Sequence, residues 1–521
     1  MTSDDGDSVG GSKGNLMSDT TFQIAAMVAY MAAMLFIGWY GYHRTKNLND
    51  YMLGGRDLHP AVAALSAGAA DMSGWLLMGL PGAIYATGLV EAWIAVGLTI
   101  GAWCNWKLVA PRLRAYTQVA NDSITIPSFL ENRLRDRSRL LRIASGVIIL
   151  AFFTFYVSSG MVAGGVFMES SFGTDYRVGM LIVAAVTITY TLFGGFLAVS
   201  FTDFVQGLMM AIALIAVPIV GVVALGGFGE VATLVQASDA AAGLNRLAFL
   251  PSPMTTVAIM GVVSALAWGL GYFGQPHIIT RFMALRDTAE ARAGRRYGIG
   301  WMLFAVAGAV ATALVGAAWF QKNGMTLDDP ETVYLRMGQI LFHPLIAGFM
   351  LAAVLAAIMS TIASQLIVTS SALVEDIYKA LGHKDRSDDH YVLMGRLAVL
   401  VVSLAAAAMA WTQNDTILAL VAFAWAGFGA SFGPIIILAL FWRKLSPMGA
   451  LAGMVTGALV VAIWGNVSGG PGGILDLYEI LPGFLANLMI AWLVSLATYT
   501  EDADVQQEFD ETLHIVEHAH D

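Results

Sequence analysis

The sequence predicts an all-α protein that crosses a membrane many times, on the grounds of its composition, its long apolar stretches and the placement of its basic residues. Of the 521 residues, 57% are hydrophobic and only 12% are charged. Soluble domains carry about 25% charged residues, so this chain has about half the usual supply for a water-facing surface. The composition therefore excludes an ordinary soluble protein, a disordered scaffold and a fibrous repeat.

Thirteen apolar stretches are long enough to cross about 30 Å of hydrocarbon, which takes about 20 helical residues. The expected spans cover residues 21–42, 62–87, 90–110, 140–166, 177–197, 203–226, 257–280, 298–320, 340–373, 392–412, 416–441, 447–465 and 478–499. The segments between them are too short for a soluble catalytic domain, which needs at least about 50 residues.

The distribution of Lys and Arg predicts the orientation of these spans. With the N-terminus outside, 22 of the 27 basic residues fall on the inward side and five on the outward side. This count assigns Arg281 to an inward loop. Because inward loops are enriched in Lys and Arg, the bias predicts an external N-terminus and a cytoplasmic C-terminus.

The sequence predicts one membrane domain, residues 21–499, between two polar tails. Residues 1–20 are acidic and rich in Gly and Ser, which predicts a disordered extracytoplasmic tail. Residues 500–521 hold eight Asp or Glu and no Lys or Arg, which predicts a cytoplasmic solvated tail or a short amphipathic helix. The single cysteine, Cys104, cannot form an internal disulfide.

Two of the spans are interrupted by Gly and Pro. Residues 64–83 have the sequence ALSAGAADMSGWLLMGLPGA, and residues 267–278 have the sequence AWGLGYFGQPHI. Transporters built from inverted repeats place their sites where such broken helices meet. The two spans are five apart and so run in opposite directions, as the first helices of two inverted five-helix repeats must. The expected repeats are residues 62–226 and 257–441, with peripheral helices 21–42, 447–465 and 478–499.

The side chains on the broken spans predict a binding site. Asp71 lies near mid-span, where a carboxylate costs about 2.5–3.5 kcal/mol, so it is expected to face a polar cavity. Trp75 and Gly79 follow it at intervals of four residues on one helix face, and Trp268, Tyr272 and Pro276 recur in the same way. The alternatives are a structural Asp bonded to Ser or backbone groups, and aromatic side chains that only pack in the core or against lipid.

The ninth span contains AAIMSTIASQL, in which Ser360 and Thr361 are adjacent and Ser364 follows. One interpretation is that these hydroxyls bond back to their own helix, as is common in membrane helices. The other is that they supply oxygen ligands to a small cation. Together with carbonyls freed by a broken helix, neutral oxygens of this kind suit sodium.

Several segments together resemble the solute:sodium symporter family, and within it the bacterial members that transport sodium and proline. The resemblance covers residues 22 to 500 and rests on GGR at 54–56, the two broken-span sequences, LENRLRDRSRLLRI at 130–143, AAIMSTIASQL at 356–366 and FAWAGFG at 423–429. It implies a leucine-transporter-type core of two inverted five-helix repeats in a bacterial inner (plasma) membrane. It also implies uptake of L-proline driven by the inward sodium gradient.

The resemblance also implies roles for individual residues. The family's sodium site would use carbonyls of Ala69, Met72 and Ala357 and the hydroxyls of Ser360 and Thr361. The matching substrate residues would be Ser73, Trp75, Gly79, Tyr156, Trp268, Tyr272 and Pro276. Asp71 matches an essential aspartate for sodium-coupled binding, Arg56 a coupling arginine, and Asp203 an aspartate near the inner sodium exit. Ala70 stands where a Ser is usual.

The chemistry of these residues is compatible with an amino acid as substrate. The helix that restarts near Ser73–Trp75 offers free N–H groups and a positive dipole end to a carboxylate. The cationic amine needs an acceptor, which Asp71, freed carbonyls or Gln275 could provide. A ring of proline's size would stack against Trp75, Tyr156, Trp268 or Tyr272. Sodium is then a co-transported ligand, and no cofactor is expected.

Other functions remain open at this point. The chain could be a sodium symporter for another small solute, such as pantothenate, a sugar or a different amino acid. A membrane sensor is disfavoured because the short C-terminal tail holds no signalling domain. An intramembrane enzyme would need a nucleophile–base pair or a metal motif, and neither His277 nor His343 lies in one. A passive channel would not need two aromatic faces at broken helices. No nucleic acid and no obligatory protein partner are expected.

Overall fold

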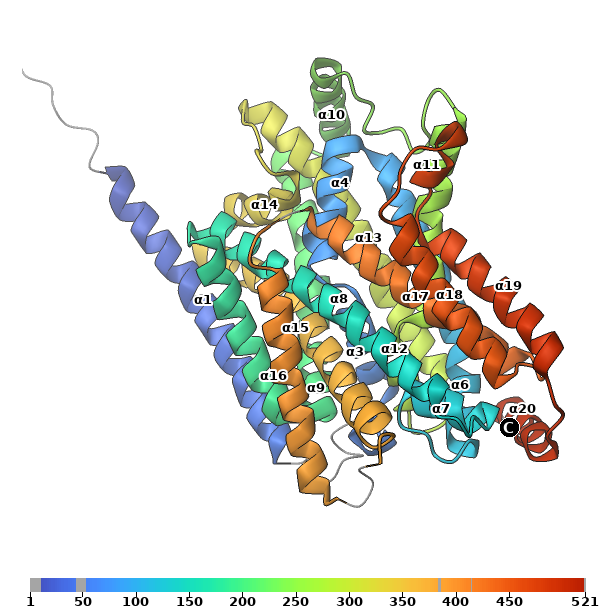
Figure 1. Cartoon of the computed structure of the whole chain (residues 1–521). Helices are drawn as coiled ribbons and strands as arrows, with labels where there is room; N and C mark the ends of the chain where they lie inside the picture. The colour runs from blue at the N-terminus through green and yellow to red at the C-terminus, as the bar shows by residue number, and fades with distance from the viewer. Residues whose placement is uncertain (1–10, 44–52, 383–385, 414, 520–521) are drawn as a thin grey trace, which may run out of the picture.

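Helices run through almost all of the computed structural model, which describes residues 11–43, 53–382, 386–413 and 415–519 (Figure 1). The elements are α1 Gly11–Tyr42, η1 Gly54–Arg56, α3 Pro60–Asp71, η2 Trp75–Gly79, α4 Leu80–Thr87, η3 Leu89–Ala92, α5 Trp93–Cys104, η4 Asn105–Val109, α6 Ala110–Val119, α7 Ile126–Leu134, α8 Leu140–Phe172, α9 Tyr176–Leu225, α10 Phe228–Ala242, α11 Thr256–Ala267, η5 Trp268–Gly274, α12 Pro276–Met283, α13 Glu290–Asn323, η6 Pro330–Thr332, α14 Val333–Leu341, α15 Pro344–Ser371, η7 Ala372–Tyr378, α16 Asp388–Met409, α17 Ile417–Phe441, α18 Pro447–Trp464, η8 Pro471–Asp476, α19 Ile480–Thr498 and α20 Ala503–His518.

The described residues contain 11 helices that are long and apolar enough to span a membrane, or 12 if the bent pair Pro60–Asp71 and Trp75–Thr87 is one span. The fifth predicted stretch, residues 177–197, corresponds to Tyr176–Leu192, a shorter apolar helix within α9. Its length falls below the roughly 20 residues that a straight span needs. The structure therefore supports a polytopic all-α fold without establishing the count of thirteen.

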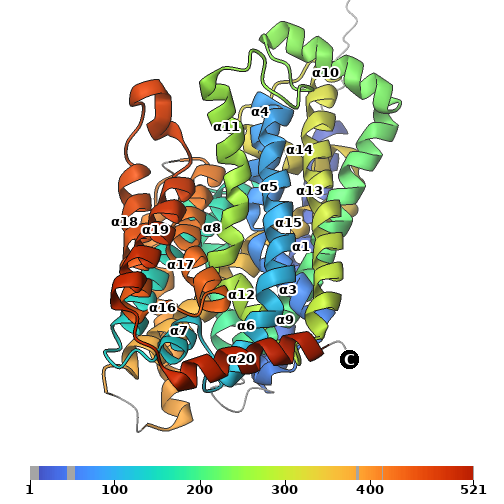
Figure 2. The ribbon, with the colours of Figure 1, turned by 90° about the vertical axis from the view of Figure 1, so that its right-hand side faces the viewer.

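Both ends of the domain differ in detail from the expected tails. Helix α1 begins at Gly11, so residues 11–20 of the predicted disordered tail are helical, and residues 1–10 lie outside the described residues. The C-terminal segment forms α20, which packs on α6 and lies across one end of the helices (Figure 2). Its buried Val505 and Phe509 form the apolar side of an amphipathic helix, one of the two predicted forms of this segment.

The first predicted break lies between α3 and η2, and the two halves are bent by 62°. Helix α3 ends at Asp71, and Met72 leaves helical geometry with φ −81° and ψ 70°. The chain restarts as a π-helix at Trp75 and continues as α4. Such π segments are rare and cluster at functional sites.

The second predicted break lies between α11 and α12. The 3-10 helix η5 follows α11 without a gap, and Gln275 is then extended with φ −81° and ψ 106°. Pro276 explains this conformation, since a proline forces the preceding residue out of the α region and favours the first position of a new helix. The broken segment is thereby held between two regular helices.

Glycines bring the second break against α5 at backbone distance. A Cβ atom on Gly101 would lie 2.2 Å from the Gly269 carbonyl oxygen, and one on Gly97 would lie 2.4 Å from the Leu266 carbonyl oxygen. Small residues of this kind allow close backbone approach between membrane helices. The position of the aromatic residues on η5 therefore depends on these glycines.

We predict that Gly101→Ala lowers the thermal unfolding temperature of the purified protein, because overpacking typically costs about 1–3 kcal/mol. The control is Gly300→Ala in α13, where an added Cβ meets nothing within 4 Å. Its unfolding temperature should be unchanged or slightly raised, since Ala is the better helix former. Equal unfolding temperatures for the two variants would contradict this account of the contact.

Candidate functional site

Aromatic side chains from both breaks gather into one cluster. The Trp75 ring lies 6.1 Å from the Trp268 ring, which stacks on Tyr478 at 5.3 Å. Trp425 of α17 completes the cluster: its ring lies 5.2 Å from that of Tyr272, and its Nε1 donates to the Trp268 carbonyl at 2.8 Å. The aromatic faces predicted on the two broken spans thus lie together.

Asp71 contacts two members of this cluster, Tyr272 and Trp75, and is 1% exposed. The Tyr272 hydroxyl donates a hydrogen bond to Asp71 Oδ2, which links the two broken spans directly. The Trp75 indole donates to the Asp71 carbonyl at 3.2 Å. In the described part of the chain Oδ1 has no hydrogen-bond partner, so one carboxylate oxygen is left to accept from a ligand.

The remaining substrate candidates surround the same region. Ser73 accepts a hydrogen bond from the Trp75 backbone N–H at 3.4 Å. Gln275 is fully buried and donates to the Trp425 carbonyl at 3.0 Å, while its Oε1 has no partner among the described residues. Tyr156 of α8 is buried, with its ring 5.8 Å from that of His277. Gly79 lies against Leu418 of α17.

The predicted sodium ligands converge where α15 crosses the end of α3. The Ser360 hydroxyl lies 2.7 Å from the Ala69 carbonyl oxygen and 3.1 Å from that of Ala357. The Thr361 hydroxyl lies 3.5 Å and 3.2 Å from the same two oxygens. Four neutral oxygens from two helices therefore share one buried spot, and Met72, the fifth candidate, is buried at the adjoining break.

Asp203 of α9 contacts α15 at Ser364, one helical turn beyond Ser360. Its Oδ2 accepts hydrogen bonds from Ser66 at 2.8 Å and Ser364 at 2.9 Å. The same oxygen pairs with the Arg281 guanidinium at 3.1 Å, and both charged side chains are at most 1% exposed. The sequence-based assignment of Arg281 to an inward loop was wrong, because α12 turns it into the core, where Asp203 neutralises its charge.

Arg56 lies apart from the aromatic cluster, on the side of the molecule that carries α20. Its guanidinium donates to the Ser123 carbonyl at 2.7 Å and pairs with Asp122 at 3.0 Å. Burial lowers the pKa of Arg56, and the Asp122 carboxylate opposes this shift. Arg56 therefore ties the segment before α3 to the loop after α6.

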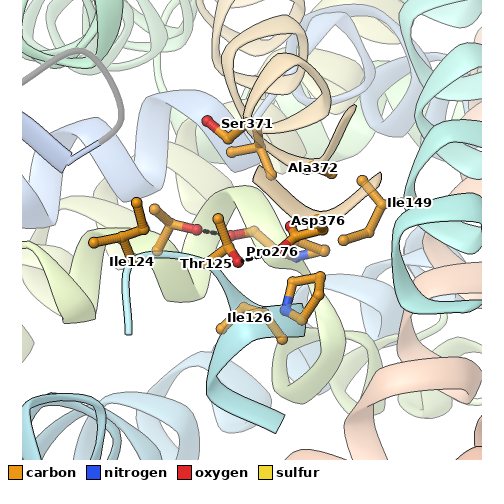
Figure 3. A pocket seen from close by; sticks show the side chains of 11 residues that line it. Ile124, Thr125, Ile126, Ile149, Pro276, Ser371, Ala372 and Asp376 are labelled. Carbon is orange, nitrogen blue, oxygen red and sulfur yellow. Dashed lines mark hydrogen bonds between the residues drawn. The ribbon is translucent and has the colours of Figure 1, made fainter. Parts of the chain in front are cut away.

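A cavity adjoins Pro276 on the side of the molecule that carries α20, and Figure 3 shows the side chains around it. Thr125, just before α7, donates to Asp376 at 2.7 Å across this cavity. Arg142 at the start of α8 then pairs with Glu131, Glu375 and Asp376, at 2.9 to 3.0 Å. These bonds join α7, α8 and η7 at the end of the site that faces α20.

At the opposite end, Glu331 of η6 joins three elements. Its carboxylate accepts hydrogen bonds from the Ile417 and Leu418 backbone N–H groups at 3.0 Å and 3.2 Å, at the start of α17. Its backbone lies against Gly82 of α4, where an added Cβ would be 2.8 Å from Glu331 Cα. Burial raises the pKa of Glu331, and the two N–H donors oppose this shift.

Sequence reasoning missed both of these end contacts. Glu331 and Arg142 lie in connecting segments or at helix ends, where a charged residue is ordinary and carries no signal. A weak signal existed for Asp376, a carboxylate that directly follows a long apolar span. Only the packing of distant elements gives these residues partners.

The family model for the sodium:solute symporter family matches residues 51–457. This match covers both broken spans, the Ser360–Thr361 pair and Asp203. The chain belongs to the sodium:solute symporter family.

Named relatives of this symporter are similar over nearly their whole length. The high-affinity proline transporter PutP of Bacillus subtilis is 55% identical over 479 residues, covering 92% of this chain and 98% of the relative. The osmoregulated proline transporter OpuE of the same organism is 51% identical over 475 residues, covering 91% and 94%. The sodium/proline symporter of Staphylococcus aureus is 49% identical over 510 residues, covering 96% and 97%.

Solved structures of transporters share the fold of this symporter. A Na+-coupled sialic acid symporter in a substrate-bound outward-open state aligns with a TM-score of 0.76 at 19% identity, covering 92% of this chain and 99% of that one. Mhp1, a nucleobase-cation-symport-1 family transporter, aligns with a TM-score of 0.52 at 14% identity, covering 88% and 98%. Identities this low establish the fold alone.

We predict that Arg281→Gln strongly destabilises the symporter, because it leaves the Asp203 charge buried without a partner. Breaking one side of a buried pair costs about 3–5 kcal/mol. The double variant Asp203→Asn/Arg281→Gln removes both charges and should recover at least half of the lost unfolding temperature in detergent. If the double variant unfolds as early as the single one, the pair does not hold these helices together.

Proposed function

We propose that the chain takes up L-proline together with sodium, as a secondary active transporter that works by alternating access. The observation that carries the proposal is the break at Asp71–Trp75: Asp71 Oδ1 has no partner among the described residues, and Asp71 lies two residues after Ala69, whose carbonyl belongs to the cluster of predicted sodium ligands. Support for proline as the substrate comes from the names of relatives that are 49 to 55% identical.

The substrate would bind at the junction of the two breaks. Its carboxylate would face the N–H groups at the start of the restarted helix near Ser73–Trp75, where the dipole is positive. Its ammonium would be accepted by Asp71 Oδ1 or by Gln275 Oε1, since neither of these oxygens has a hydrogen-bond partner among the described residues. The pyrrolidine ring would then lie against the aromatic side chains of Trp75, Tyr156, Trp268 and Tyr272, with Gly79 and Pro276 at the two ends.

Sodium would couple to substrate through the backbone of the same break. An ion held by Ala69, Met72, Ala357, Ser360 and Thr361 ties the end of α3 to α15. This holds the break in the shape that presents Asp71 and the helix start to the substrate. By linkage, sodium tightens substrate binding and substrate tightens sodium binding by the same factor. Arg56 and Asp203 would act in coupling, at the start of α3 and beside the inner end of the sodium site.

The proposed architecture is that of the sequence prediction. Thirteen spans would include the short Tyr176–Leu192 segment, and residues 62–226 and 257–441 would form two inverted five-helix repeats of the leucine-transporter type. The domain would lie in a bacterial plasma membrane with an external N-terminus and a cytoplasmic C-terminus, since basic residues concentrate on the side that carries α20. It would need lipid but no cofactor and no obligatory protein partner.

A second candidate is sodium-coupled uptake of another small solute, such as a different amino acid or pantothenate. The buried aromatic cluster with a single carboxylate favours a compact amino acid over a sugar, which would need more hydrogen-bonding side chains. Competition against labelled proline by other amino acids and by pantothenate separates the two candidates.

We predict that Asp71→Asn abolishes sodium-driven uptake of labelled proline in proteoliposomes, because it removes the charge that accepts the ammonium group. Uptake by the wild type should require an inward sodium gradient and should not be supported by potassium. Asp389→Asn, at an exposed position of α16, is the matched control and should transport normally. Sodium-independent entry of proline, or uptake of a different solute only, would overturn the assignment.

We predict that Thr361→Ala raises the sodium concentration for half-maximal uptake about tenfold, the effect of losing about 1.4 kcal/mol of binding. Thr369→Ala is the control: it removes a buried hydroxyl two turns farther along α15 that bonds only to the Gln365 carbonyl of its own helix. The control should change the sodium requirement less than twofold. The same shift in both variants would place the sodium site elsewhere.

A further inference from the structure

A cavity of about 230 Å³ lies on the side of the molecule that carries α20, away from the aromatic cluster. It is bounded by the end of α7, the loop that follows α7, the junction between α17 and α18, and the segment between α19 and α20. Its walls include Arg133, Arg135, Arg137, Arg443, Leu445, Ser446, Tyr499 and Asp502. Four guanidinium groups therefore surround one space, with a single carboxylate in the lining.

Two of these arginines already have acidic partners on α20. Arg135 pairs with Glu508 at 2.5 Å, and Arg443 pairs with Asp510. Arg137 is exposed, and the described part of the chain provides no acceptor for it. The Asp502 carboxylate is occupied as the N-cap of α20, accepting from the Asp504 and Val505 backbone N–H groups. The balance of charge around the cavity is positive.

Arg133 forms the buried wall of the cavity and is 0% exposed. Its Nε donates to the Ala439 carbonyl at 3.2 Å, but Nη1 and Nη2 have no acceptor in the part of the chain that the structure describes. The guanidinium lies 5.0 Å from the Tyr116 ring and 5.4 Å from the Phe509 ring. Aromatic faces and the nearby Glu508 carboxylate, which also pairs with Arg135, compensate part of this charge, and an anion in the cavity would supply the acceptor that Nη1 and Nη2 lack.

The cavity opens where lipid headgroups would lie. Leu445, Ser446 and the start of α18 form one edge, and Tyr499, which follows α19, forms another. The neighbouring surfaces of α18 and α19 are apolar and exposed, as at Met448 and Leu496. Tyr and Arg at the end of a lipid-facing helix are typical of the headgroup region, and basic pockets at that depth bind anionic headgroups.

We propose that this cavity binds a phosphate ester anion, the headgroup of an anionic phospholipid in the leaflet that faces α20. The phosphate would pair with Arg137, the arginine without an acceptor, and would lie in the field of Arg133. The bound lipid would bridge α7, the start of α18 and the start of α20. A free phosphate ion has the same chemistry, so the experiment must separate these two sources.

The test is native mass spectrometry of the full-length symporter, titrated with phosphatidylglycerol and separately with phosphatidylcholine. The wild type should bind phosphatidylglycerol at least about fivefold more tightly, since one basic residue near a membrane surface contributes about that factor. Arg137→Gln should reduce this preference about fivefold and leave phosphatidylcholine binding unchanged. Arg296→Gln, an exposed arginine of α13 outside the cavity, is the charge-matched control.

The outcomes separate the possibilities. Equal binding of the two lipids, or a preference that both variants retain, overturns the proposal. Displacement of phosphatidylglycerol by millimolar inorganic phosphate in the wild type, but not in Arg137→Gln, keeps the phosphate site and assigns it to a soluble anion. Sodium-driven uptake by Arg137→Gln in phosphatidylcholine vesicles checks that this variant is folded. If the wild type failed to take up proline, that result would contradict the proposed function and would leave the lipid-binding comparison unaffected.

Discussion

The contact between the Ser360 hydroxyl and the Ala69 carbonyl is the interaction on which the rest of the site depends. It forms because α3 ends at Asp71, which leaves carbonyls near the break free of partners in their own helix. Only a break in a buried helix exposes such oxygens at this depth, since an intact helix uses them internally. The same break begins a new helix at Trp75, so one local departure from regular structure provides both the carbonyl oxygens proposed to bind sodium and the N–H groups proposed to face the substrate carboxylate.

The two breaks reinforce one another across the core. Pro276 and the glycines of η5 place Trp268 against Trp75 and Tyr272 against Asp71, and the Tyr272 hydroxyl joins the two spans. Around them, charged contacts close both ends: Glu331 holds η6 against the start of α17, and Arg142 holds α7 against η7. A transporter must open one end at a time, and polar contacts between elements can separate at less cost than a packed apolar interface because water replaces their partners.

The α20 side of the molecule shows a different use of charge. Arg133 is buried with aromatic rings around it and a cavity beside it, while Arg135 and Arg443 fasten α20 to the membrane domain. Some of the basic residues on which the proposed orientation rests therefore also hold parts of the structure together. Arg135 and Arg443 attach the C-terminal helix, and Arg133 and Arg137 belong to the proposed site for anionic lipid.

The sequence by itself determined the all-α membrane fold, the two broken spans and the neighbourhood of Asp71, because apolar length and Gly/Pro interruptions are local properties. Only the tertiary structure decided which distant residues become partners. The sequence placed Arg281 in a loop, whereas in the structure it lies on α12 and pairs with Asp203 in the core. Tyr176–Leu192 has the apolar composition of a membrane span but is shorter than a span. The sequence did not predict the contacts of Trp425 and Glu331, since these contacts join helices far apart in the chain.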